Sequence, residues 1–136
     1  MISDNPDWDQ FITEHRWGVL TTLRKSATPS SSLVAYARDA DELIISTPGT
    51  TFKRRSIEHN PDVSFCVISN AEPFNYVTVE GAARISTEHL LEDTRLLFAN
   101  IAETGYAEPA DLPGWLKKQQ RVIIRIRPTR VHGVIR

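Results

Sequence analysis

Apolar and polar positions alternate over most of this chain, which is the pattern of strands with one buried face. Such stretches, bounded by turn residues, occupy 16–24, 30–38, 42–47, 63–68, 75–86 and 121–127, with a last short piece at 131–135. Gly81, inside the longest stretch, predicts a bulge or a sharp bend. Pro128 predicts a break between the last two pieces.

The alternation also predicts which side chains are buried. In the longest strand Val77 and Val79 are expected on one face, and Tyr76 and Thr78 on the other. In the last full strand the apolar residues are expected to point inward. The outward side chains of that strand would be arginines, namely Arg121, Arg125 and Arg127.

Helical spacing interrupts the strands in four places. The first helix begins at Asn5-Pro6, and a second, capped by Thr50 or Thr51, ends at Asn60-Pro61. The longest begins at Ser86 or Thr87 and ends at Gly105, and a short one lies around 112–116. Together these elements predict a mainly β (α+β) fold, a six- to seven-stranded antiparallel barrel with peripheral helices.

Composition narrows the class of protein. The 136 residues are 40% hydrophobic and 24% charged, which predicts one globular domain over 1–136. The net charge of −1 argues against a dedicated nucleic-acid binder. The single cysteine, Cys66, allows no intramolecular disulfide, and no apolar run is long enough to span a membrane. We therefore expect a cytoplasmic protein with no membrane association.

The second helix is charged against its own dipole. Lys53, Arg54 and Arg55 occupy its first turns, where the positive end of the helix dipole favours acidic residues. An anion at this terminus would meet free backbone amides, threonine hydroxyls and Lys53. The alternative is a solvated basic face on a connecting helix.

Ordinary catalytic motifs are missing from the chain. No GxGxxG or GxxxxGK[ST] stretch occurs, and the four histidines lack metal-binding spacing. Cys66 lies mid-strand among apolar residues, which is typical of a buried structural thiol. We expect no catalytic side chain and no metal site, so an enzymatic function would depend on a bound cofactor.

The order of segments resembles one known family. The segments GVLTTLR, SSLVAYAR, DELIIST, TTFKRRSIEHNPDVSFCVI, YVTVEGAARIS and RVIIRIRPTRVHGV are similar to the split β-barrel that binds FMN or the deazaflavin coenzyme F420. This is the pyridoxamine 5'-phosphate oxidase-like superfamily. The resemblance covers nearly the whole chain and implies a homodimer with two cofactor sites between its subunits.

The resemblance also implies which residues bind the cofactor. Lys53 to Ile57 match a K-x-[RK]-[NS]-[LI] stretch whose lysine holds the cofactor phosphate, and strand 30–34 would line the ring. Tyr76 and Thr78 of the partner's long strand would approach from across the interface. The expected cofactor-binding residues are Ser30, Ser32, Ser46, Thr47, Thr51, Lys53, Arg55, Tyr76 and Thr78.

The cofactor itself stays open between F420 and FMN. Leu33 stands where many F420-binding relatives have the second proline of P-x-x-x-P, Ser56 where asparagine is common, and Thr51 where arginine is frequent. The polyanionic tail of F420 would suit the available arginines, which could equally be solvated. These arginines are Arg54, Arg55, Arg121, Arg125 and Arg127.

The resemblance implies an F420-dependent oxidoreductase that passes hydride to a small planar acceptor. The alternatives are an FMN-binding oxidoreductase and a non-catalytic flavin- or tetrapyrrole-binding protein. Tyr36, Tyr76 and Trp115 could contact the acceptor or could be packing residues.

Overall fold

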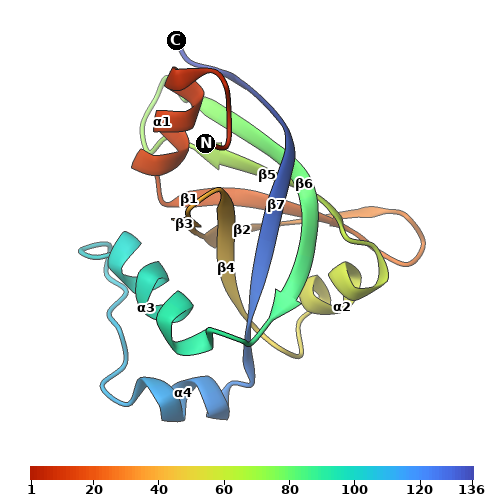
Figure 1. Ribbon diagram of the computed structural model, residues 1–136, viewed down its shortest axis with the longest axis vertical. Helices are drawn as coiled ribbons and strands as arrows, with labels where there is room; N and C mark the ends of the chain where they lie inside the picture. The colour runs from red at the N-terminus through yellow and green to blue at the C-terminus, as the bar shows by residue number, and fades with distance from the viewer.

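A single seven-stranded antiparallel sheet dominates the computed structural model, which describes residues 1–136. Its strands follow the order β2-β1-β5-β6-β7-β4-β3, and the sheet curls into a half-barrel (Figure 1). The strands are β1 (Trp17–Leu23), β2 (Pro29–Ala35), β3 (Ala37–Asp39), β4 (Glu42–Pro48), β5 (Asp62–Ile68), β6 (Tyr76–Ser86) and β7 (Arg121–Val134). The predicted mainly β fold with peripheral helices is confirmed.

The predicted alternation of the two faces is confirmed for β6, although Thr78 on its outer face is only 8% exposed. Val77 and Val79 are fully buried on β6, where they share the barrel interior with Leu20 and Phe65. The residues paired with them on the neighbouring strands, from β1 to β7, lie on the same concave face of the sheet. The main hydrophobic core is therefore the concave face of the sheet.

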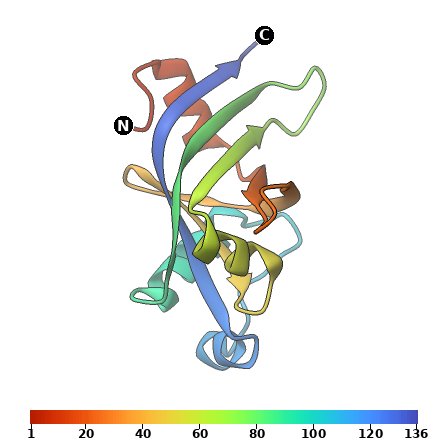
Figure 2. The ribbon, with the colours of Figure 1, turned by 90° about the vertical axis from the view of Figure 1, so that its right-hand side faces the viewer.

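The long β6–β7 pair bends at Gly81. The register shifts between Glu80 and Gly81, which marks the predicted bulge. A Cβ on Gly81 would lie 2.3 Å from the Arg127 carbonyl oxygen, so only glycine lets the two strands approach this closely. Beyond the bulge the two strands curve on to the other end of the barrel (Figure 2).

The break predicted at Pro128 is wrong. Pro128 pairs with Gly81 inside one continuous strand, β7. Proline has no amide hydrogen to donate, but at a bulge the ladder is already interrupted, so the residue is tolerated there. The single strand therefore links the two halves of the barrel.

The strand predicted at 30–38 is divided in two at Tyr36. Residues 29–35 pair with β1, whereas residues 37–39 pair with β4. Tyr36 lies at the corner with no exposed surface, and its hydroxyl donates a hydrogen bond to the carbonyl of Ile12. This tyrosine is therefore a core residue, which removes it from the acceptor candidates.

Four helices surround the sheet: α1 (Pro6–Glu14), α2 (Phe52–His59), α3 (Leu90–Asn100) and α4 (Leu112–Lys118). The Asn5 and Thr51 side chains cap α1 and α2 as predicted. The predicted limits of α3 are wrong, because Ser86 completes β6 and the helix ends at Asn100. Turns then lead to Gly105, whose φ of 98° is left-handed.

The helices lie at different places around the barrel. α1 covers the end of the sheet near both termini (Figure 1). α2 packs on the concave side, against β1, β4 and β6, whereas α3 packs on the outer side of β3, β4 and β7 (Figure 2). None of the four is long and apolar enough to cross a membrane.

A buried arginine ties α3 to the sheet. Arg125 on β7 points outward as predicted, but it is only 8% exposed because α3 covers it. Its guanidinium lies 2.8 Å from Asp93 of α3, 2.8 Å from Asp39 and 3.1 Å from Glu42. The two alternatives expected for Arg125, a solvated side chain and a contact to the cofactor tail, are both wrong, since it is buried and paired with three carboxylates.

Glu42 connects this cluster to a second arginine. Arg84 donates to both carboxylate oxygens of Glu42, at 2.6 and 3.0 Å. This hydrogen bonding is the main reason that the pKa of Glu42 is lowered, and Arg125 adds to the effect. The hairpin of β3 and β4, strand β7 and helix α3 are thus joined by charge as well as by packing.

We predict that Arg125→Met lowers the free energy of unfolding by about 3 kcal/mol, because it leaves the buried Asp93 without its counter-charge. Urea denaturation measures this loss. Arg127→Met is the matched control, since Arg127 lies two residues along the same strand, is exposed and makes no ion pair. Its effect should stay within about 0.5 kcal/mol. Equal losses in the two variants would contradict the role of the cluster.

Candidate functional site

The N-terminus of α2 brings two predicted hydroxyl groups together. The Thr51 hydroxyl caps the helix by accepting from the Arg54 amide at 3.5 Å. It also lies 2.9 Å from the Thr47 hydroxyl at the end of β4. Thr47 is almost completely buried, so this pair fixes the start of α2 against the strand.

The three cations of α2 have different surroundings. Arg54 pairs with Glu58 at 3.1 Å one turn later, and Arg55 lies 4.7 Å from the centre of the Phe52 ring. Lys53 is half-buried and forms no ion pair. Lys53 is therefore the cation of this helix that remains available for an anion, and Arg55 is exposed beside it.

Ser46 and Thr47 lie on opposite faces of β4, although they are neighbours in sequence. Thr47 pairs with Val122 on the concave face, whereas Ser46 pairs with Ile123 on the outer face. The outer face at this point is covered by α3, and Ser46 opens into a cavity there. A single ligand can approach both side chains only from the free edge of the strand.

That free edge belongs to the split of the barrel. Residues 45–48 of β4 pair only with β7, and β2 pairs only with β1, so no ladder joins β2 to β4. Ser30 and Ser32 lie on β2 opposite Thr22 and Leu20, which point to the concave side. Both serines are half-buried. The split therefore has hydroxyl groups on both sides, near the start of α2.

Tyr76 and Thr78 lie elsewhere. They are on the outer face of β6, as predicted, where Thr78 is flanked by Cys66 and His132 on the neighbouring strands. Within one chain they face away from the concave side, which carries Thr47 and α2. The structure thus brings Thr47 and Thr51 into contact at the start of α2 and places Ser30 and Ser32 across the split. It puts Ser46 on the opposite face of β4, and within one chain it separates these residues from Tyr76 and Thr78.

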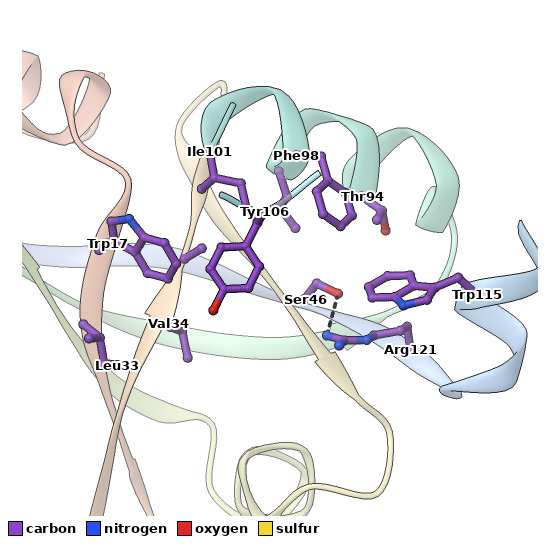
Figure 3. A pocket seen from close by; sticks show the side chains of 12 residues that line it. Trp17, Leu33, Val34, Ser46, Thr94, Phe98, Ile101, Tyr106, Trp115 and Arg121 are labelled. Atoms are coloured by element: carbon purple, nitrogen blue, oxygen red, sulfur yellow. Dashed lines mark hydrogen bonds between the residues drawn. The ribbon is translucent and has the colours of Figure 1, made fainter. Parts of the chain in front are cut away.

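The outer face of the split holds a cavity of about 450 Å³ that sequence reasoning did not find (Figure 3). α3, the 101–115 segment and the ends of β1, β2, β4 and β7 form its walls. Its lining residues are Trp17, Leu33, Val34, Ala35, Ser46, Thr94, Leu97, Phe98, Ile101, Tyr106, Trp115 and Arg121. Of the predicted cofactor residues only Ser46 lines it, and Trp115 was an acceptor candidate.

Arg121 is the only charged residue in this lining. Its guanidinium lies 4.5 Å from the centre of the Trp115 ring, and it donates to Gln119 at 2.8 Å and to Ser46 at 3.4 Å. Burial lowers its pKa, yet an arginine stays protonated at neutral pH. One signal in the sequence could have indicated this site, namely Tyr106 and Trp115 in the segment between α3 and the arginine that begins β7.

Comparison with known proteins agrees with this fold. The family model of pyridoxamine 5'-phosphate oxidase matches residues 5–135. The fold is a split β-barrel of this type, and the chain belongs to the pyridoxamine 5'-phosphate oxidase family. No curated protein matches the chain closely enough to be counted as a relative.

Several solved structures are similar. An F420 reductase is 27% identical, with 91% of this chain and 94% of that one covered and a TM-score of 0.73. A FAD-binding protein from Mesorhizobium loti is 21% identical over 96% of this chain and 94% of that one, with a TM-score of 0.73. The heme storage protein of Vibrio cholerae is 18% identical over 94% and 92%, with a TM-score of 0.71. Proteins with this fold are thus named for three different cofactors.

Proposed function

We propose that the protein is an oxidoreductase that binds coenzyme F420, with FMN as the alternative, and passes hydride to a small planar acceptor. The observation that carries this proposal is the unpaired Lys53 beside the Thr47–Thr51 hydroxyl pair at the start of α2. A phosphate at this position would accept from the lysine and from the first backbone amides of the helix. The negative charge of the phosphate would then offset the repulsion between the helix dipole and the basic residues in the first turns of α2.

The similarity to an F420 reductase supports the same proposal. At 27% identity over nearly the full length of both chains, it is a closer match than the FAD-binding and heme-storage neighbours. The split between β2 and β4 begins beside the proposed phosphate position. A ring system placed along this split would meet Ser30 and Ser32 on one side and Ser46 on the other.

The chain's own residues would act by binding and orientation. A bound deazaflavin or flavin supplies the hydride, so no side chain needs to act as acid, base or nucleophile. Lys53 and the threonine pair would fix the phosphate end, and Arg55 would add positive charge. The aromatic walls beside the split would exclude water from the reacting face.

We also propose a homodimer that uses the uncovered outer face of the sheet. No helix packs on the row formed by Leu33, Val19, Cys66, Thr78 and His132, which are register neighbours across β2, β1, β5, β6 and β7. Leu33 is 62% exposed and also lines the cavity. A partner on this face would therefore lie beside the site, which fits the role expected for Tyr76 and Thr78 of the other subunit.

A non-catalytic role remains the second candidate function, because one structural neighbour is named for heme storage. Such a protein would hold a planar anionic ligand on the same scaffold without turnover. Cofactor titration followed by reoxidation separates this candidate from the oxidoreductase.

The first test identifies the cofactor. We expect purified protein to bind F420 more tightly than FMN or heme, as followed by ligand fluorescence and visible absorption. Reduced F420 bound to the protein should then be oxidised by a planar acceptor such as a quinone. A yellow protein with an FMN spectrum would replace F420 by FMN. Binding of heme alone would contradict the oxidoreductase proposal.

The second test removes the proposed phosphate contact. Lys53→Ala should weaken cofactor binding by about tenfold or more, because a charged hydrogen bond contributes about 1.5–3 kcal/mol. Its free energy of unfolding should change by less than about 0.5 kcal/mol, since Lys53 makes no ion pair. Lys118→Ala on the exposed end of α4 is the control. An affinity equal to that of the control would exclude Lys53 from the site.

The third test concerns the homodimer. Sedimentation should give twice the 15.4 kDa mass of one chain. Val134→Glu, at a 40% exposed apolar position next to Tyr76 on the outer face, should shift the protein toward the monomer. Leu96→Glu is the matched control, because Leu96 is 38% exposed but lies on α3. A monomeric parent protein would refute this arrangement.

A further inference from the structure

The cavity beside the split has walls of a particular kind. Nine of its twelve lining residues are hydrophobic. Figure 3 shows the rings of Trp17, Tyr106, Phe98 and Trp115 arranged around one space, with the side chain of Arg121 reaching into it from β7. Phe98 and Trp115 pack edge to face at 5.7 Å, and Trp17 and Tyr106 lie 6.0 Å apart, so these rings support one another. The space is suited to a flat molecule.

The charge in this cavity has no counter-charge. No acidic residue lines the cavity, and Arg121 makes no ion pair. Both of its hydrogen-bond acceptors, Gln119 and Ser46, are neutral. Arg125, on the same face of the same strand, is surrounded by three carboxylates instead. On this face of β7, one arginine therefore has its charge compensated within the chain and the other does not.

The position of the guanidinium is also restrained. It stacks on the Trp115 ring, and the Gln119 and Ser46 side chains hold its nitrogens. A partly desolvated cation surrounded by apolar groups is stabilised strongly by an anion, because little water competes for it. An arginine fixed in this way can bind a carboxylate through two parallel hydrogen bonds.

We propose that this cavity binds a planar aromatic anion, with its carboxylate or phenolate on the guanidinium of Arg121 and its ring system among Trp17, Phe98, Tyr106 and Trp115. The volume of about 450 Å³ lies within the range of small-molecule sites and suits a molecule of two or three fused rings. In its identification of this ligand as the acceptor, the inference rests on the proposed function. As a statement about binding, it stands without a cofactor.

The cavity is less suited to the acidic tail of F420. Such a tail is flexible and polar, whereas most of this lining is apolar and only one cation is present. An apolar aromatic wall gains from burying rings rather than from surrounding charged chains. This comparison favours an aromatic occupant for the cavity.

The experiment uses 2-naphthoate and its neutral analogue 2-naphthamide, titrated calorimetrically into the full chain without cofactor. We expect 2-naphthoate to bind at least about tenfold more tightly, since the analogue cannot form the charged contact. Arg121→Met, which keeps an apolar stem against Trp115, should abolish this preference, and Arg121→Lys should retain part of it. Arg127→Met changes the charge equally at an exposed position of the same strand and should have no effect.

Equal binding of the two naphthalenes by the parent protein, or no binding of either, would overturn the proposal without the need for any variant. Displacement of 2-naphthoate by saturating F420 or FMN would assign the cavity to the cofactor and overturn its assignment to the acceptor. Binding of 2-naphthoate by a protein that binds neither cofactor would refute the proposed function and leave the anion site standing. Binding of a cofactor without 2-naphthoate would do the reverse.

Discussion

The pairing of β6 with β7 is the constraint on which the rest of the structure depends. These two strands run through both halves of the barrel and join β5 on one side to β4 on the other. The bulge at Gly81 shifts the register by one residue and lets the pair bend, and on either side of it valines of β6 and isoleucines of β7 point to one common core. On the outer side, the half beyond the bulge is covered by α3, and the other half carries no helix. The pairing of these two long strands thus determines where a ligand or a second subunit can reach the sheet.

Charge compensation then distinguishes structural from available cations. Arg125 is paired with Asp39, Glu42 and Asp93, so its role is to hold α3 and the β3–β4 hairpin on the sheet. Lys53 and Arg121 have no acidic partner. They lie at the two sides of the split, one near the start of α2 and the other in an aromatic cavity. In the arrangement that we propose, Lys53 would bind the phosphate of the cofactor and Arg121 the anionic group of the acceptor.

Particular residues show why sequence reasoning succeeded in some places and failed in others. The alternation in β6 predicted the inward valines correctly, because a strand with one buried face must repeat every two residues. The same rule placed Arg125 outward, but it could not show that a helix more than thirty positions away in sequence covers that face. Pro128 was predicted to break the strand because proline cannot donate to a strand ladder. The prediction failed because proline is tolerated opposite the bulge at Gly81, and the sequence does not show that these two residues pair. The predicted strand 30–38 is divided at Tyr36 because the residues before it pair with β1 and those after it pair with β4.

The sequence by itself determined the class of fold, the basic start of α2 with its threonine cap, and the family to which the chain belongs. These follow from local patterns, in which hydrophobic period, turn residues and capping side chains act over a few positions. Only the tertiary structure decided which cations remain unpaired, on which face Ser46 and Thr47 lie, and that Trp17, Tyr106, Trp115 and Arg121 meet around one cavity. The reason is physical: pairing, burial and cavity walls depend on contacts between distant segments, and such contacts leave no periodic trace along the chain.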